Sequence, residues 1–421
     1  MNDLERRVRQ LLDPYTGTGL SSRELLQNVY RRLVDRLFFG DFHVTEHTQL
    51  IGGREIAQIV ATKAGRVIGP GLLCCTRLDD PGRLEHALPW NDQANLDKNV
   101  WSLLVYLTQM DVLASTSVDR FVRPVSLLLT SGPSWFQHEA VFDTLTKNAA
   151  TPQCALVSYP TRGAVASGHK GEISVRLRPT DELKARLRPR LAGQNVERAH
   201  TKEVETDLLD PDGLFVKLLG SEDVSLHDMT LSGGTASVVL ASDGLGEKMP
   251  WQWAPVPDGT PIGCDVRELL LILSRHIVSL EKASLDGRVV SIDSSDEIVA
   301  IDLAIGFTNS PEEAMETIVE IVSDDTMFHV ALEGVVPQLT PTTGGLLHQC
   351  LNALETETTD VQPTPTEAGV FAAQNIESFI TGPGSMMPGG TVTVNTTQLD
   401  GYGQLFEELV DNLALNDPRS V

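Results

Sequence analysis

Two stretches on either side of a short turn decide the fold that the sequence predicts. QCALVSYP (153–160) is a short apolar run, whereas GEISVRLRP (171–179) alternates polar with apolar residues. An apolar run is typical of a strand that is covered on both faces, and alternation is typical of a strand with one exposed face. The sequence therefore predicts that a buried sheet ends near Pro160 and that a second, half-exposed sheet begins soon after it.

The residues before Pro160 predict an α/β domain. NVWSLLVYLTQMDVLAS (99–115) has the apolar spacing of a helix, and Asp97 stands just before it in the position of an N-cap. Strands and helices that alternate along the chain are typical of a sheet flanked by helices. Further strands are expected within 55–65, 66–80 and 124–131, and further helices at 21–38 and 138–150.

The residues after Pro160 predict an inserted α+β domain. After the strand at 171–179, the patterns are those of a helix at 264–283, strands at 288–293 and 297–307, a helix at 309–325 and a strand at 329–337. Strand, helix, two strands, helix and strand is the order of a ferredoxin-like domain. Patterns of the α/β kind then return, with helices expected at 344–356 and 402–415 and a helix-to-strand segment at 369–384.

These patterns together predict a two-domain chain. Residues 1–168 and 336–421 are expected to form one discontinuous α/β domain with a mixed central sheet and helices on its faces. Residues 169–335 are expected to form the inserted ferredoxin-like lid domain. Within it, the polar and turn-rich stretch at about 178–256 is an atypical insert whose structure the patterns do not assign.

Charge and cysteine content exclude several classes of protein. The 421 residues include 33 basic and 57 acidic side chains, and the formal net charge is −24. Nucleic acids and anionic membranes bind basic surfaces, so neither is an expected partner. No apolar run reaches the roughly 20 residues of a membrane span, and Met1 precedes a charged segment rather than a secretory signal. Five scattered cysteines without a CxxC pair favour a reducing, cytoplasmic location.

Five stretches of the sequence, taken in order, resemble the characteristic stretches of one protein family. They are CCTRLDD (74–80), NLDKNVWSLLVYL (95–107), LVSYPTRGAVASGHKGEISVRL (156–177), PDGTPIGCDVRELLLILSRHI (257–277) and TPTEAGVFAAQNIESFITGPGS (364–385). In this order the chain is similar to the M20 metallopeptidases and deacylases, especially to the acetylornithine deacetylase and succinyl-diaminopimelate desuccinylase-like members. The resemblance implies a peptidase-like α/β domain with an inserted lid, a possible homodimer formed through the lid, and two zinc ions that activate water for amide hydrolysis.

The metal ligands that the resemblance implies can be placed one at a time, and most of them are missing. Arg77 stands at the position of the first histidine ligand, and a guanidinium cannot coordinate a cation. Asp79 and Asp97 match the supporting and the bridging aspartate. The other positions do not match: Pro133 and Ser134 stand at the expected pair of glutamates, Tyr159 stands at a carboxylate position, Ala304 stands at the usual arginine of the lid, and 385–397 contain no histidine.

We therefore expect a degenerate metal site that binds no cofactor. The charge of Arg77 would neutralise Asp79 and Asp97 in place of the metal. On this interpretation no residue is catalytic, and the remnant of the cleft consists of Arg77, Asp79, Asp97, Ser134 and Tyr159. The candidate ligand-binding residues are His169, Thr366, Glu367, Gly382 and Gly384. Any metal that did bind would use Asp79 and Asp97.

Three classes of function remain open at this point. The favoured one is a pseudoenzyme that binds an unknown small molecule or protein partner in the former cleft. The second is a metal-dependent amidohydrolase that uses zinc with non-standard ligands and cleaves an N-acyl amino acid or a small peptide. The third is a metal-independent transferase or lyase that uses the same cleft.

Four other features have structural and functional interpretations. His43 and His47 have the spacing of a helical metal site, but the stretch is β-prone, which favours surface histidines. The GPG at 382–384 either lines a pocket or makes a turn. Cys74 and Cys75 are expected to be buried as small apolar residues rather than to act as nucleophiles. His169 is expected to have a structural role near the junction of the two domains.

Overall fold

The computed structural model divides the chain into two compact units. The first consists of residues 1–171 and 336–421, and the second of residues 172–335. The described residues are 41–51, 54–67, 71–78, 93–131, 152–181, 200–207, 224–232, 235–242, 254–255, 276, 279–280, 282–295, 298–323, 327–356, 358–359, 364–387 and 391–415. The helices expected at 21–38 and 138–150, and most of the helix expected at 264–283, lie outside them.

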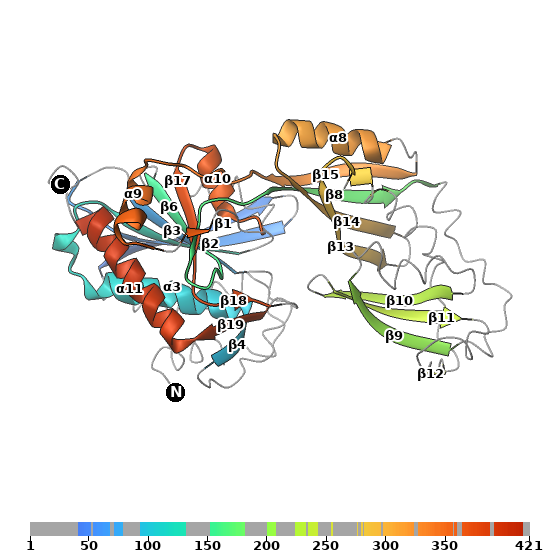
Figure 1. Ribbon diagram of the computed structural model, residues 1–421, viewed down its shortest axis with the longest axis horizontal. Helices are drawn as coiled ribbons and strands as arrows, with labels where there is room; N and C mark the ends of the chain where they lie inside the picture. Colours follow the sequence, from blue (N-terminus) through green and yellow to red (C-terminus); the bar gives the residue numbers. More distant parts are fainter. Residues whose placement is uncertain are drawn as a thin grey trace. The chain divides into compact units, whose positions relative to one another are not determined.

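The first unit is built on a mixed eight-stranded sheet, and Figure 1 labels its strands β1, β2, β3, β6 and β17. Its order is β1-β2-β5-β3-β6-β17-β7-β16, and β5, β3, β6 and β17 are parallel to one another. At the edge of the sheet, β2 runs antiparallel to β5, and β1 runs antiparallel to β2. The strands are β1 (Phe42–Ile51), β2 (Arg54–Lys63), β3 (Leu72–Leu78), β5 (Val125–Ser131), β6 (Cys154–Ser158), β7 (Val165–Ala166), β16 (Thr358–Thr359) and β17 (Glu377–Thr381).

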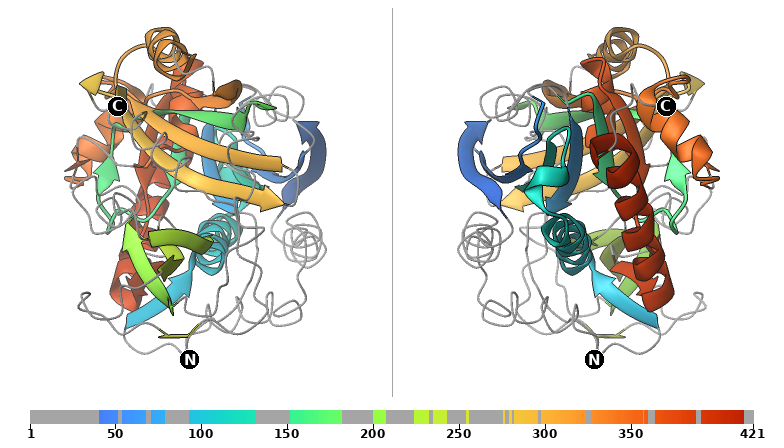
Figure 2. Two further views of the ribbon diagram at one scale, coloured as in Figure 1. Left: turned by 90° about the vertical axis from the view of Figure 1, so that its right-hand side faces the viewer. Right: turned by 90° about the vertical axis from the view of Figure 1, so that its left-hand side faces the viewer.

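Helices cover both faces of this sheet, because the side chains of its central strands are apolar on both sides. Along β3, Leu72, Cys74 and Leu78 pack into one buried cluster, and Leu73 and Cys75 pack into another. The first cluster contains residues of α3 (Lys98–Ser115), α9 (Leu346–Ala353) and α11 (Thr396–Val410), and the second contains residues of α10 (Glu367–Ala373). The end-on views in Figure 2 show α11 beside α3. The expected burial of Cys74 and Cys75 is confirmed.

Short-range signals explain where the helices of this unit begin. Asp97 caps α3 as expected, since its Oδ1 accepts a hydrogen bond of 2.8 Å from the backbone N–H of Asn99. The last helix was expected from residue 402 but begins at Thr396. Asn395 and Gln398 form a reciprocal capping box there, which adds a turn and a half to the expected helix.

A small sheet completes the first unit. It contains β4 (Gln93–Asp97), β18 (Ser385–Met386) and β19 (Thr391–Asn395), in the order β18-β19-β4. It therefore joins the chain just before α3 to the chain just after the GPG segment. Among the helices that the structure describes, none is long and apolar enough to cross a membrane.

The second unit has the expected α+β core. Its sheet has the order β13-β14-β8-β15, and α8 lies between β14 and β15 in the chain. The elements are β8 (Gly171–Pro179), β13 (Asp286–Ser295), β14 (Ile298–Phe307), α8 (Pro311–Ser323) and β15 (Phe328–Val336). Ser310 accepts a hydrogen bond from the backbone N–H of Glu313 at the start of α8, as an N-cap does. The sheet order, together with the described strands and α8, is that of the ferredoxin-like class.

The stretch at 178–256 that the patterns left unassigned contains a second sheet in this unit. Its order is β10-β11-β9-β12, and all of its neighbours are antiparallel. The strands are β9 (His200–Asp207), β10 (Val224–Ser232), β11 (Thr235–Ser242) and β12 (Ala254–Pro255).

Candidate functional site

The candidate residues of the first unit lie where its parallel strands end. Arg77 is the penultimate residue of β3, and Tyr159 and Gly382 directly follow β6 and β17. In open α/β sheets, ligands bind beyond the carboxyl ends of the parallel strands. We call Arg77, Tyr159, Thr366, Glu367, Gly382 and Gly384 the carboxyl-edge site.

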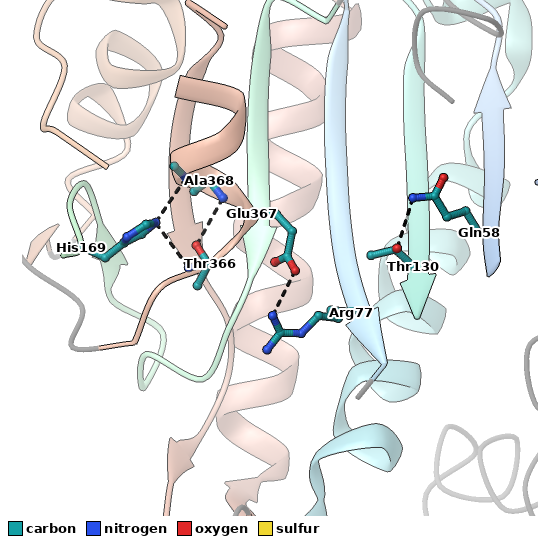
Figure 3. Close-up of polar contacts among 8 residues, drawn as sticks. Gln58, Arg77, Thr130, His169, Thr366, Glu367 and Ala368 are labelled. Carbon is teal, nitrogen blue, oxygen red and sulfur yellow. Dashed lines mark hydrogen bonds and ion pairs between the residues drawn. The ribbon is translucent and has the colours of Figure 1, made fainter. Parts of the chain in front are cut away.

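A row of polar side chains crosses the sheet at this edge on the side of α10. Thr130 of β5 lies in register with Gln58 of β2 and with Arg77 of β3. Gln58 Nε2 donates a hydrogen bond of 3.3 Å to Thr130 Oγ1. Figure 3 shows these side chains with Glu367 beyond them. At the end of the row, Arg77 contacts Glu367, the first residue of α10.

Arg77 and Glu367 form a buried ion pair at the centre of this edge. Arg77 Nη1 donates to Glu367 Oε1 over 3.1 Å, and the two side chains are only 12% and 5% exposed. A guanidinium and a carboxylate removed from water in this way stabilise each other only while both are present. Arg77 is therefore paired with Glu367, which was not part of the cluster of Arg77, Asp79 and Asp97 that the sequence predicted. Asp79 and Ser134 lie outside the described residues, so their place in that cluster stays a prediction.

Asp97 has a clear structural role, because it caps α3. Its carboxylate accepts the hydrogen bond from Asn99 described above, and its backbone pairs with Thr391 in the small sheet. The carboxylate is thereby fixed at the positive end of an 18-residue helix. A substitution that removes this cap would lower stability, whatever else Asp97 does.

The GPG segment makes a turn that packs closely on the residues after β6. The carbonyl of Gly382 accepts hydrogen bonds from the backbone N–H groups of Thr161 (3.1 Å) and Gly163 (3.0 Å). A Cβ atom on Gly382 would lie 2.5 Å from the carbonyl oxygen of Tyr159, and Gly384 has a φ of +85°. Gly382 is therefore required because the backbone of Tyr159 lies too close for a side chain, and Gly384 because its φ is positive.

Aromatic and cationic side chains surround this turn. Trp101 Nε1 donates to the carbonyl of Pro383 over 2.8 Å, and Tyr159 Oη donates to Thr364 Oγ1 over 3.0 Å. Lys98 Nζ lies over the ring of Tyr159, 5.8 Å from its centroid, which is a cation–π distance. Arg162 is exposed, and its Nε donates to Ser385 Oγ over 3.0 Å.

His169 is a structural acceptor, as its position near the junction suggested. Its Nε2 accepts hydrogen bonds from the backbone N–H groups of Thr366 (3.3 Å) and Gly369 (3.2 Å). Its Nδ1 lies 2.7 Å from the carbonyl oxygen of Lys170, which can only accept, so the proton belongs on Nδ1. Burial lowers the pKa of His169, although the bond to Lys170 and the charge of Glu367 act in the opposite direction. His169, Thr366 and Glu367 are thus brought together around the start of α10 (Figure 3).

The residues present at the first expected ligand position do not fit a metal. Arg77 offers no lone pair, its charge is fixed, and it is bound to a carboxylate. Within the ranges that the structure describes, no group of three or more His, Cys, Asp or Glu side chains converges in a way that could hold a metal ion. Pro133 and Ser134 are outside those ranges, so the mismatch at these two positions rests on the sequence.

The other candidate groups of the sequence have structural surroundings. His43 and His47 lie on β1 rather than on a helix, and His43 is exposed. Burial raises the pKa of Cys74 and Cys75 far above the usual range for a thiol. A protonated thiol is a poor nucleophile, so neither cysteine is suited to covalent chemistry.

Sequence patterns missed a buried polar network on the opposite face of the sheet. Thr76 Oγ1 donates to Ser158 Oγ over 3.0 Å, and Gln109 Nε2 donates to Ser158 Oγ (3.3 Å) and Tyr402 Oη (2.7 Å). These residues come from β3, β6, α3 and α11. The sequence holds little signal for such a network, since polar residues at strand ends usually only mark the start of a loop.

Comparisons with known proteins establish the fold. No protein-family model matches the sequence, and no curated protein matches it. Among solved structures, a tripeptidase from Staphylococcus aureus aligns over 97% of this chain and 96% of its own, with a TM-score of 0.50 and 10% identity. The aminopeptidase PepT from Bacillus cereus aligns over 97% of both chains, with a TM-score of 0.52 and 11% identity. The chain therefore has the fold of these two peptidases, an α/β domain with an inserted α+β domain, as the resemblance to the M20 family implied.

Proposed function

We propose that this chain is a non-catalytic member of the M20 family, which binds a short peptide or an N-acylated amino acid at the carboxyl-edge site without cleaving it. One observation carries the proposal: Arg77 occupies the position at which the resemblance implies the first zinc ligand, and it forms a buried ion pair with Glu367. A fixed cation there takes the place of a metal rather than binding one.

Electrostatics support the absence of a di-zinc centre. Two divalent cations placed near a buried guanidinium would be repelled by it, and the repulsion is poorly screened away from water. Glu367 is already paired with Arg77. Among the described residues, Asp97 is the one that retains the ligand type implied by the resemblance, and its carboxylate caps α3.

The choice of ligand class rests on the fold and on the cations around the GPG turn. The two similar structures are named as a tripeptidase and an aminopeptidase, whose names refer to peptides as substrates. Arg162 presents an exposed guanidinium next to this turn, and its backbone is held by a 2.7 Å hydrogen bond to the carbonyl of Gly384. Guanidinium groups bind carboxylates in a bidentate geometry, so Arg162 is suited to a free or terminal carboxylate.

An active amidohydrolase is the second candidate, and the fold match over nearly the whole chain favours it. In that case zinc would be held by Asp97, Asp79 and ligands that the family pattern does not contain. The substrate would be an N-acyl amino acid or a small peptide.

Metal content and hydrolysis separate the two candidates. We expect protein purified from zinc-supplemented medium to contain far less than one zinc ion per chain by elemental analysis. We also expect no release of amine from tripeptides or N-acetyl amino acids, with or without added Zn²⁺, Mn²⁺ or Co²⁺. Stoichiometric zinc together with hydrolysis that is lost in Asp97→Asn would establish the amidohydrolase. Asn is chosen because it preserves the N-cap of α3, which Ala would remove.

Binding can be tested at Arg162. We expect isothermal titration calorimetry to detect binding of at least one member of a panel of tripeptides and N-acetyl amino acids. The Arg162→Ala variant should bind that compound roughly 10- to 100-fold more weakly, because a charge-assisted hydrogen bond contributes about 1.5–3 kcal/mol. Arg120→Ala removes an exposed arginine elsewhere in the same unit and is the matched control. No binding by the wild type, or equal binding by both variants, would contradict this part of the proposal.

A further inference from the structure

His169 lies where the chain leaves the first unit and where it returns. The first unit ends at Gly171 and resumes at Val336, and His169 and Leu339 lie just inside these two points. Their backbones form an antiparallel bridge, with the N–H of each donating to the carbonyl of the other over 3.1 Å. One residue therefore connects both passages of the chain.

The imidazole of His169 extends this connection to α10. Only 3% of the residue is exposed, and its Nε2 accepts hydrogen bonds from two backbone N–H groups at the start of that helix. Packing leaves the ring little freedom, because a Cβ atom on Gly369 would lie only 2.8 Å from His169 Cε1. The next residue after Thr366 is Glu367, the partner of Arg77.

We propose that His169 is a pH-sensitive latch. Protonation of its Nε2 separates the start of α10 from the His169–Leu339 bridge and weakens the ion pair between Glu367 and Arg77. A protonated ring would turn an N–H towards the two backbone N–H groups that it now accepts from. Both hydrogen bonds would be lost, and three donors would face one another without an acceptor. The inference does not depend on the proposed function, because it concerns only the chain's own contacts.

Burial of the ring, which outweighs the charged groups around it, sets the direction of the effect. The charge of Glu367 on α10 acts on His169, Lys170 adjoins it in the chain, and Glu172 follows on β8, whereas 336–339 contain no ionisable residue. Burial outweighs Glu367 and the Lys170 carbonyl and lowers the pKa of His169 below its usual value. Its neutral form is thus favoured by folding, and that stabilisation is lost as the pH falls from the unfolded value towards the lower folded one.

Amide hydrogen exchange in residues 364–374 tests the latch. We expect protection of the wild-type segment, corrected for intrinsic exchange rates, to fall at least about tenfold between about pH 7.5 and about pH 5. Protection of the α3 core, residues 103–107, should stay the same and excludes global unfolding. The His169→Gln variant keeps an acceptor that does not titrate, so its segment should show no such fall. His43→Gln, at an exposed histidine of β1, should behave as the wild type does.

Two results would overturn the proposal. One is wild-type protection that does not change over this pH range, and the other is an equal loss of protection in His169→Gln. If that variant does not fold, an NMR titration of the wild type decides the question. The amide resonances of Thr366 and Gly369 must then shift together with the His169 ring, and a ring that titrates without them would refute the latch.

Discussion

We expect the Arg77→Ala substitution to lower the free energy of unfolding by about 3–5 kcal/mol, the usual cost of breaking a buried ion pair. Glu367 is 5% exposed, so the variant would leave its carboxylate buried without a cation. The loss would be larger than for a surface pair, which contributes only about 0–1 kcal/mol. Urea unfolding of wild type and variant, with equal slopes, measures the difference directly.

The double variant shows whether the pair or the packing is responsible. Arg77→Met with Glu367→Gln removes both charges and keeps similar volumes, so it should recover most of the stability that either single substitution removes. Arg120→Ala, at an exposed arginine of the same unit, should change stability by less than about 0.5 kcal/mol. An Arg77→Ala variant as stable as the wild type would show that the ion pair does not hold this edge together.

Local patterns predicted most of the first unit because the signals act over a few residues. Asp97 was expected as the cap of α3 because an N-cap and the helix that follows it are adjacent in the chain. The apolar run of β3 indicated a strand covered on both faces, and Leu73 and Cys74 are indeed fully buried on opposite faces. Short elements such as β4 and β19 were not expected, since each is only five residues long and pairs with a distant segment.

The sequence named Arg77, Thr366 and Glu367 as candidate residues but did not predict their contacts. The ion pair between Arg77 and Glu367 joins residues 290 positions apart in the chain. It depends on how α10 packs on β3, which no local pattern encodes. For the same reason, His169 was named as a candidate ligand-binding residue, although its imidazole accepts two backbone hydrogen bonds from α10.

The GPG turn offers the second large effect, because its backbone leaves no space for a side chain at Gly382. A Cβ atom there would lie 2.5 Å from the carbonyl oxygen of Tyr159 and 2.8 Å from the ring of Trp101. Trp101 is 1% exposed and is fixed by its hydrogen bond to Pro383, so neither neighbour can move cheaply. Gly382→Ala should therefore lower the free energy of unfolding by about 2–3 kcal/mol, as overpacking in a rigid core does.

The matched control for this substitution is Gly401→Ala. Gly401 lies on the exposed side of α11, and a Cβ atom there would meet no atom within 4 Å. Alanine should stabilise that helix by about 0.5–1 kcal/mol, so the two substitutions are expected to change stability in opposite directions. Urea unfolding followed by tryptophan fluorescence measures both. If Gly382→Ala is as stable as the wild type, the turn can shift away from Tyr159, and the GPG segment would then be free to line a pocket.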